Sequence, residues 1–424
     1  MKKKKILLIS YWINKQGNSP GIMADDKVFN LNKLGYKTIV LSSYDSKIIR
    51  DKNIIHYRIP SISFNDFIYE IKNKKFNDIY VLYLMLPIIL TIGILLDLFE
   101  HFLLRGKGGG KWFWFLSAMM IGIFICLFHK VDYLFTTGGP ASAHLTGILT
   151  NFFFKKKLFI ELQDPLVGKD IGRSNLSSKY LLIFEKLILK SCYRLVFVTN
   201  TAAIECRKRN PKFKSKIKGI YSGAVKLLNC KKKKFSKNLR FIHSGTLYTS
   251  RNFKNLILAI NFSVKKNKLN MSKISILNYG DVYGEEQIKM LNQPYIKWCK
   301  SKNRLSAIKV CCKSDILLLI QHTDQRSKLT FPFKLYEYLN LPKIIFALTN
   351  NNELKNMLLK RGHVCANINN INDISTKINF ILRNKKKLLK NIIRKKHLFE
   401  INSTQQCHKI FKLDMNERIE KNFR

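Results

Sequence analysis

A short aromatic stretch, FPFKLYEYLNLPK, carries a lysine and a glutamate three residues apart, Lys334 and Glu337. Pro332 suits the first position of a helix and Pro342 cannot continue one, so the stretch predicts a short helix. On such a helix the two side chains are neighbours and could form an exposed ion pair. The alternative is a site, in which Glu337 accepts hydrogen bonds from a sugar's vicinal hydroxyls while the helix start holds the adjoining phosphates.

A second basic group follows a predicted strand in HSGTLYTSRNFKNL (His243–Leu256). Gly245 and Thr246 form the turn, and Arg251 leads into the next helix. Arginine presents a planar set of donors that phosphate oxygens accept. A solvated, basic helix start would have the same composition. Together with the aromatic stretch, this loop favours a site for a nucleotide diphosphate.

Three loops in the first half of the chain carry further candidates, and each follows a predicted strand. Gly17 and Asn18 lie in YWINKQGNSPG, where glycine lets the backbone approach a ligand. His144 follows TTGGPASA near a helix start and could face a cleft, although a single histidine is more often packed or solvated. Asp164 in IELQDPL precedes a proline, which is also ordinary turn punctuation.

These loops are held by apolar, β-rich runs that alternate with segments of helical period, a pattern typical of a parallel sheet covered on both faces. The predicted strands of the first series are Ile6–Ser10, Lys37–Leu41, Tyr133–Thr136, Leu158–Leu162 and Leu195–Thr199. Those of the second series are Leu239–His243, Ile274–Leu277, Asp315–Ile320 and Ile344–Leu348.

The charge run KLLNCKKKKFSKN (Lys226–Asn238) separates the two series. We therefore expect an α/β protein of two doubly wound, Rossmann-like domains, residues 1–228 and 229–424. In such sheets ligands bind at the carboxyl ends of the strands, which is where the candidate loops begin.

Two segments differ from the strands and amphipathic helices of a soluble α/β protein, because they contain no charged residue. These segments are Ile79–Leu96 and Trp112–Phe128. Each is about long enough to span a bilayer, and Trp112 and Trp114 suit a membrane interface. The alternative is a pair of buried helices in an α/β domain. Because sheet-packing helices usually keep a polar face, we expect an apolar insert at about 79–128 that dips into a membrane.

The chain has 76 Lys and Arg against 27 Asp and Glu, a net charge of +49 at pH 7. This balance favours anionic partners such as nucleic acid, acidic lipids or phosphorylated metabolites. Lysine is spread over the whole chain, as an AT-rich genome would impose, and no nucleic-acid-binding module is present, so we expect no nucleic-acid partner. The nine cysteines form no CxxC pair and predict no structural metal site.

Longer motifs add a resemblance. SGTLYTSRNFKNLILAI, SDILLLI and FPFKLYEYLNLPKIIFAL resemble the nucleotide-sugar half of GT-B glycosyltransferases of family four, the retaining "group one" enzymes. TTGGPASAHLTGIL and LFIELQDPL resemble the other half, in members associated with bacterial surface polysaccharide synthesis. The resemblance covers most of the chain outside the apolar insert and the last few dozen residues. It implies two Rossmann-like domains that face a central cleft.

The resemblance also implies roles for residues. Glu337 would bind the donor ribose, Arg251 the diphosphate and the Gly17 loop the transferred sugar, while Asp164 would sit by the acceptor and, with His144, handle its proton. The expected catalytic residues are Asp164 and His144, and the expected donor-binding residues are Gly17, Asn18, Gly245, Thr246, Arg251, Pro332, Lys334 and Glu337.

The expected partners follow from the same resemblance. They are a nucleotide-diphosphate sugar, a lipid-linked or oligosaccharide acceptor and an anionic membrane surface, at the cytoplasmic face of the inner membrane. The nucleotide sugar is a substrate, so we expect no cofactor. The chain has no Asp-x-Asp pair, so cationic side chains rather than a metal ion would neutralise the leaving group.

Two departures favour a different function. The family often has an acidic residue eight positions before the helix glutamate, where this chain has Leu329, and its usual Asn-Gly at the end of the first domain is replaced by YSGAV. Such changes would suit a non-catalytic GT-B scaffold of a membrane polysaccharide assembly complex.

Overall fold

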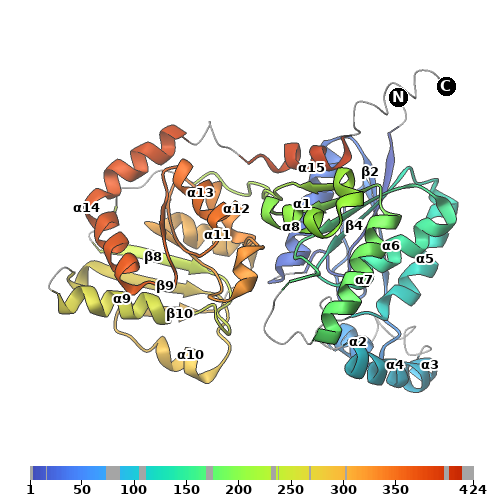
Figure 1. Ribbon diagram of the computed structural model, residues 1–424, viewed down its shortest axis with the longest axis horizontal. Helices are drawn as coiled ribbons and strands as arrows, with labels where there is room; N and C mark the ends of the chain where they lie inside the picture. Colours follow the sequence, from blue (N-terminus) through green and yellow to red (C-terminus); the bar gives the residue numbers. More distant parts are fainter. Residues whose placement is uncertain are drawn as a thin grey trace. The chain divides into compact units, whose positions relative to one another are not determined.

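The computed structural model describes residues 3–15, 17–72, 86–104, 111–168, 175–230, 235–236, 238–266, 269–300, 303–395 and 401–412. The chain divides into two compact α/β units (Figure 1). Unit 1 comprises Met1–Ser222 and Ser403–Arg424, and unit 2 comprises Gly223–Asn402.

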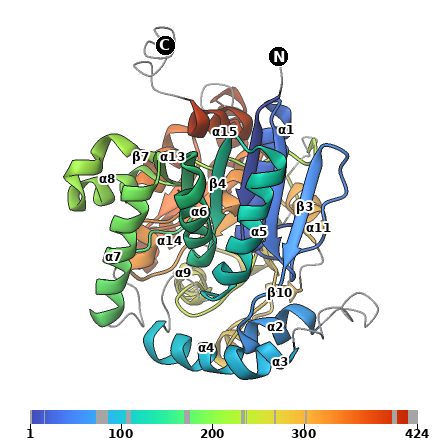
Figure 2. The ribbon, with the colours of Figure 1, turned by 90° about the vertical axis from the view of Figure 1, so that its right-hand side faces the viewer.

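Unit 1 is built on a parallel sheet with the strand order β3-β2-β1-β4-β5-β6-β7. Its strands are β1 (Lys5–Ile9), β2 (Lys37–Ser43), β3 (Ile54–Ile59), β4 (Tyr133–Gly138), β5 (Lys157–Leu162), β6 (Arg194–Phe197) and β7 (Ile217–Gly219). The central strands are buried apolar runs, because helices cover both faces of the sheet (Figure 2). All strands point the same way, so the loops that follow them share one edge.

The helices of unit 1 divide between the two faces of its sheet. One face packs against α1 and α15, which share a core with β1, β4 and β5, and the other packs against α5 and α6. The helices are α1 (Ser19–Lys33), α2 (Phe64–Ile71), α3 (Leu86–Ile88), α4 (Ile94–Phe99), α5 (Trp114–His129), α6 (Ala141–Phe154), α7 (Asn175–Ser191), α8 (Asn200–Arg209) and α15 (Ser403–Phe411), with π-helical turns η3 (Ile89–Gly93) and η4 (Glu100–Leu104) and the 3-10 turn η5 (Pro211–Lys216).

Unit 2 repeats the plan with a parallel sheet in the order β10-β9-β8-β11-β12-β13. Its strands are β8 (Leu239–Ser244), β9 (Ile274–Tyr279), β10 (Ile296–Cys299), β11 (Ile316–Ile320), β12 (Ile344–Leu348) and β13 (Val364–Ala366). Its helices are α9 (Lys254–Lys265), α10 (Glu285–Met290), α11 (Arg304–Lys313), α12 (Lys334–Leu339), α13 (Asn352–Lys360) and α14 (Ile371–Lys395), with the 3-10 turns η6 (Met271–Lys273) and η7 (Gln325–Lys328). The chain order steps outward from β8 in both directions, which defines a doubly wound sheet.

The predicted strands are confirmed, and the sequence missed strands at or near the sheet edges. The missed strands are β3, β7, β10 and β13. β10 has three exposed positions out of four and β3 is half-buried throughout, so neither shows the continuous apolar run of a central strand.

The expected apolar insert at about 79–128 is described only in part, and its contact with a membrane stays a prediction. Residues 79–85 and 105–110 lie outside the described part of the chain, and the described part contains no helix both long and apolar enough to cross a membrane. The second apolar segment is α5, an ordinary sheet-covering helix that buries Trp114 and packs against α6. Gly122 permits that contact, because a Cβ there would lie 2.6 Å from the Thr150 hydroxyl. α5 lacks the polar face expected of such a helix, since Met120, Phe124, Leu127 and Phe128 are exposed.

The predicted boundaries also need correction, because the chain returns to unit 1 near its end. Unit 1 closes at Ser222 rather than at residue 228, and α15 packs on α1. Phe411 lies in the core between Phe135 and Phe159, at ring-centroid distances of 5.3 and 4.9 Å. The buried Arg194 guanidinium donates to backbone carbonyls at the end of α15, including that of Ile410 at 2.8 Å.

Candidate functional site

The donor-site candidates of unit 2 meet where β8 ends, at Gly245. Its φ of 136° lies in the region that favours glycine, and a Cβ there would come within 2.5 Å of Lys334 Nζ. Gly280, after β9, would likewise clash with the Gly245 backbone if it carried a Cβ. The β8 and β9 loops and the start of α12 are therefore packed together, with Thr246 half-buried beside them.

Lys334 does not pair with Glu337, and instead donates from Nζ to His243 Nε2 at 2.8 Å. Asn278 fixes the histidine tautomer: its Nδ2 donates to Gly280 O, so its Oδ1 accepts from His243 Nδ1 at 2.7 Å. His243 Nε2 is then the acceptor that Lys334 needs. No sequence pattern indicated this neutral partner, which lies 91 residues away along the chain.

Arg251 is the second cation at this position. Burial lowers the pKa of Lys334 well below its usual value, and the Arg251 guanidinium lowers it further. The pKa of His243 also lies well below its usual range, because of burial, then Lys334 and Arg251. The arrangement places two cationic groups and a neutral imidazole at one sheet edge, which is the electrostatic setting of an anion site.

Glu337 is held by a residue that the sequence did not single out. Arg304, the first residue of α11, donates from Nε to Glu337 Oε1 at 2.7 Å, and both side chains are largely buried. Asn303 anchors the start of α11 through a reciprocal capping box with Ser306. The alternative of an exposed Lys334–Glu337 ion pair is therefore wrong, and the carboxylate is instead preorganised by a guanidinium.

The short helix itself is confirmed, with a shifted start. α12 begins at Lys334, and Pro332 precedes it by two residues and accepts a hydrogen bond from the Leu335 amide at 2.9 Å. Tyr338, fully buried, accepts from the Ser244 amide at 2.9 Å and ties α12 to the end of β8. A helix of six residues contributes little dipole of its own, so the charge at this site comes from side chains.

The loops after β1, β4 and β5 of unit 1 also converge. A Cβ on Gly139 would lie 3.4 Å from Pro20 and 3.6 Å from Trp12. Gln163, after β5, donates to the Pro20 carbonyl at 3.3 Å and to the Thr137 hydroxyl at 3.2 Å. The sheet edge thus brings together three loops that are far apart in sequence.

The predicted residues of unit 1 occupy different environments on this edge. Gly17 is exposed with a φ of 73°, and Asn18 caps α1 by accepting from the Gly21 amide at 2.8 Å. Asp164 is exposed directly after β5. His144 is buried inside α6, where its Nδ1 lies 2.8 Å from the Thr136 hydroxyl and burial lowers its pKa to about 4. This geometry suits packing rather than proton exchange with a substrate.

A buried carboxylate lies behind the β1 loop. Tyr11 OH donates to Glu70 Oε1 at 2.7 Å, and the Ser61 amide donates to Oε2 at 3.0 Å. Burial raises the pKa of Glu70 to about 8. The sequence did not single out this residue because it sits on α2, away from any glycine-rich loop.

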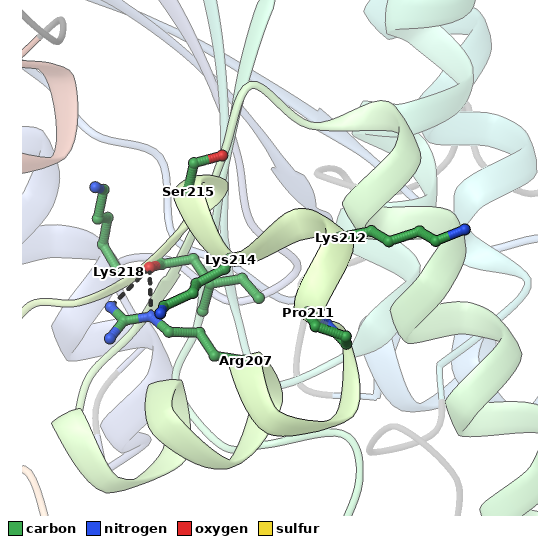
Figure 3. Close-up of a pocket in the computed structure, with 7 residues that line it drawn as sticks. Arg207, Pro211, Lys212, Lys214, Ser215 and Lys218 are labelled. Carbon is green, nitrogen blue, oxygen red and sulfur yellow. Dashed lines mark hydrogen bonds between the residues drawn. The ribbon is translucent and has the colours of Figure 1, made fainter.

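A basic hollow of about 600 Å³ lies elsewhere, on α8, η5 and β7 (Figure 3). Arg207 donates from Nε and Nη2 to the Ile217 carbonyl, while Lys212 and Lys218 point away from each other. No predicted site residue lines it. Its cations do not converge on one point, so it is a weaker anion site than the β8 edge.

In the part of the chain that the structure describes, no group of three or more His, Cys, Asp or Glu side chains could hold a metal ion. Metal independence itself stays a prediction.

Comparisons with known proteins identify the fold. A glycosyltransferase from Rickettsia africae ESF-5 has 15% identity and a TM-score of 0.60, over 100% of this chain and 99% of that one. HepE from Anabaena, in complex with UDP and glucose, has 12% identity and a TM-score of 0.63, over 100% and 99%. Sucrose-phosphate synthase from Thermosynechococcus elongatus has 11% identity and a TM-score of 0.64, over 99% of this chain and 99% of that one.

These likenesses define a class. The two parallel-sheet units have the fold of GT-B glycosyltransferases. No protein-family profile matches the sequence, and no curated protein matches it either. A UDP-N-acetylglucosamine 2-epimerase shares the fold as well, so the choice of reaction must come from the site.

Proposed function

We propose that the protein is a retaining glycosyltransferase that moves a sugar from a nucleoside-diphosphate sugar to a saccharide acceptor. The observation that carries this proposal is the meeting of Lys334 and Arg251 at the end of β8, with neutral His243 as the hydrogen-bond acceptor of the lysine. Two half-buried cations side by side are costly until an anion arrives. A diphosphate has the charge to bridge them.

The same cations serve the chemistry. When the bond between sugar and diphosphate breaks, negative charge develops on the leaving phosphate, and fixed cations stabilise it most where water is scarce. Glu337, oriented by Arg304, accepts hydrogen bonds from the vicinal hydroxyls of the ribose. The relative complexed with UDP and glucose supports a nucleotide sugar as the donor. Turnover in the presence of EDTA is expected.

For the acceptor, the proposal uses the converged loops of unit 1. Asp164 is exposed on that edge and accepts the proton of the acceptor hydroxyl. His144 has no part in this step, because its ring is buried in α6. In a retaining transfer without a protein nucleophile, the hydroxyl attacks from the face that the diphosphate leaves, so positioning of both substrates supplies most of the rate.

A thermal-shift screen tests the donor site. Purified protein is heated with UDP-, GDP- and CDP-linked sugars, alongside Glu337→Ala and the exposed control Glu285→Ala. One nucleotide class should stabilise the wild type and the control but not Glu337→Ala. No shift with any nucleotide would overturn the proposal in favour of a non-catalytic scaffold. Binding followed by epimerised free nucleotide sugar, with no transfer, would indicate an epimerase.

We further infer that the acceptor is lipid-linked and that the protein works at the cytoplasmic face of an anionic membrane, as in surface polysaccharide synthesis. The support lies in residues 86–104, where the Asp97 carboxylate is held by neighbouring polar groups while Thr91 and His101 are exposed. Asp97 accepts from the Ser63 hydroxyl at 2.5 Å and from the Asn65 amide at 2.7 Å. Gly93 is pressed against the backbone, since a Cβ there would lie 2.6 Å from the Ile62 carbonyl.

Large apolar side chains dominate the exposed surface of this segment. Leu95 and Phe102 are 67% and 76% exposed, and other large side chains of the segment are also exposed: Leu90, Ile92, Ile94, Leu98 and Phe99. A surface helix normally has the opposite arrangement. A largely apolar exposed surface on a chain of net charge +49 suits an anionic bilayer, into which such a helix lies flat.

Vesicle flotation tests this membrane contact. Leu95→Glu and Phe102→Glu should abolish binding to vesicles with anionic lipid, whereas Tyr283→Glu, a matched change at a 62% exposed aromatic in unit 2, should leave it intact. Nucleotide binding should be unchanged in all three variants. Equal flotation of the Leu95 and Phe102 variants and the wild type would exclude this segment as the docking element.

A further inference from the structure

A chain of polar side chains joins the β8 loop to the β11 loop in unit 2, next to the proposed diphosphate site. Ser250 Oγ donates to Asp324 Oδ2 at 2.7 Å. The same oxygen lies 2.9 Å from His322 Nδ1, and His322 Nε2 lies 3.1 Å from the Tyr248 hydroxyl. His322 is 5% exposed, so this is an interior network rather than a surface contact.

The directions of the two hydrogen bonds of Ser250 in this chain are determined. A serine hydroxyl has one proton, and Ser250 gives it to Asp324, so His322 Nδ1 must donate to Ser250. With a neutral imidazole Nε2 is bare and accepts from Tyr248, and with an imidazolium Nε2 donates to the Tyr248 hydroxyl. The chain runs from Tyr248 through His322 and Ser250 to the Asp324 carboxylate, and each link polarises the next.

The turn that this network holds contains Arg251. Tyr248 and Arg251 exchange two backbone hydrogen bonds, each of 3.0 Å. Thr249, between them, has a φ of 46°, and its carbonyl accepts from Gln287 at 3.0 Å. The Arg251 guanidinium carbon lies 5.3 Å from the centre of the Tyr248 ring. Tyr248 therefore packs against Arg251 with its ring while its hydroxyl is fixed by His322.

We propose that Ser250, His322 and Asp324 are positioning residues that aim the Arg251 guanidinium at the β-phosphate of the nucleotide donor. This inference rests on the proposed function, because it takes the nucleoside diphosphate as the ligand of Arg251. The network touches the turn from the β11 side, whereas Lys334 is fixed independently by His243. Breaking this network should weaken the contribution of Arg251 to diphosphate binding and leave the rest of the site in place.

The test uses Ser250→Ala, which cuts the chain in the middle, and Ser250→Thr, which restores the hydroxyl. Calorimetric titrations of the full-length protein measure affinity for the nucleoside diphosphate that binds and for its monophosphate. Loss of this hydrogen-bonded support should weaken diphosphate binding roughly threefold to tenfold. Monophosphate binding should not change, and Ser250→Thr should match the wild type. Adding Ser250→Ala to Arg251→Ala should cost nothing more.

Other results separate the possible failures. Equal weakening of both nucleotides by Ser250→Ala, or an additive loss in the Arg251→Ala background, would overturn the positioning role. If the wild type binds no nucleoside diphosphate, the proposed function is wrong and the ligand assigned to Arg251 is wrong with it. Hydrogen exchange of the amides at Tyr248–Arg251 still tests the hold on the turn: faster exchange in Ser250→Ala supports it, and unchanged exchange contradicts it.

Discussion

Two lysines, one in each unit, show how the same sheet architecture serves different ends. Lys27 of α1 is 1% exposed and pairs with fully buried Glu161 of β5 at 2.6 Å. Lys334 sits beside the end of β8, yet its partner is neutral His243 and it faces Arg251. The charge of Lys27 is neutralised by Glu161, whereas the charge of Lys334 would be neutralised only by an anionic ligand.

The comparison separates structural charge from functional charge. In unit 1 a third group completes the pair, because Thr137 donates to the other oxygen of Glu161 at 2.9 Å. Such a pair costs desolvation that it recovers only while both partners are present. In unit 2 the cations are arranged for binding, so their removal should affect ligands more than folding. The predictions below test this contrast, from the largest expected effect to the smallest.

Lys27→Met should destabilise the protein by about 3–5 kcal/mol, because it leaves the Glu161 carboxylate buried without its cation. Denaturant unfolding of the variant measures this loss. Lys33→Met, at an exposed position on the same helix, is the control and should lie near the wild type. A small loss in Lys27→Met, similar to that of the control, would contradict the structural role of the pair.

Lys334→Met should have the opposite effect, a loss of activity without a loss of stability. Transfer should fall by roughly a hundredfold to a thousandfold, because a fixed charge at the leaving phosphate is lost. Stability should hold, since removing one of two facing cations relieves repulsion and the methionine fills the space. Initial rates and unfolding curves measure both quantities, with the exposed Lys297→Met as the control. A stability loss as large as that of Lys27→Met would break the comparison.

Asp164→Asn tests the catalytic assignment in unit 1. The asparagine cannot accept the proton of the acceptor, so kcat should fall about a hundredfold while donor affinity changes little. Exposed Asp51→Asn in the same unit is the control. A rise in the donor KM with an unchanged kcat would move Asp164 from the chemistry to binding.

Glu70 should give unit 1 a pH dependence. Burial raises its pKa from 4.5 to about 8, so between these values the folded state keeps a proton that the unfolded state releases. The contribution of this group to stability is full below the unfolded pKa and is lost as pH rises through about 8. One such group changes stability by at most about 1.4 kcal/mol per pH unit. Urea midpoints at pH 6 and pH 8.5 should differ more for the wild type than for Glu70→Gln.

Most of the fold could be predicted from sequence, because buried parallel strands are continuous apolar runs that need no partner to be seen. β1, β5 and β11 are examples. The edge strand β10 escaped because it is mostly exposed, and α15 because its place on α1 depends on a return of the chain that local pattern does not encode. α5 covers the sheet although its outer face is as apolar as its inner one, so its sequence does not distinguish a sheet-covering helix from a membrane-contacting one.

For the site, the sequence was enough to predict which loops form it. It was not enough to predict the hydrogen-bond partners of the charged side chains on those loops. Glycine and charge after predicted strands located Gly245, Arg251 and Lys334 near one another, since adjacent parallel strands end at one edge. The acceptor for Lys334 and the cation for Glu337 are set by packing between distant elements. Sequence spacing suggested that these two residues pair with each other, and the structure gives them separate partners, His243 and Arg304.

The most direct test of the central claim is a calorimetric titration of UDP, GDP and CDP into the wild type and Lys334→Met. We expect one of these nucleotides to bind the wild type and to lose at least about tenfold in affinity in the variant, as expected when a charged contact to phosphate is removed. Binding that is equal in both proteins, or binding of none of the three nucleotides to the wild type, would contradict the assignment of the β8 edge as a nucleotide-diphosphate site.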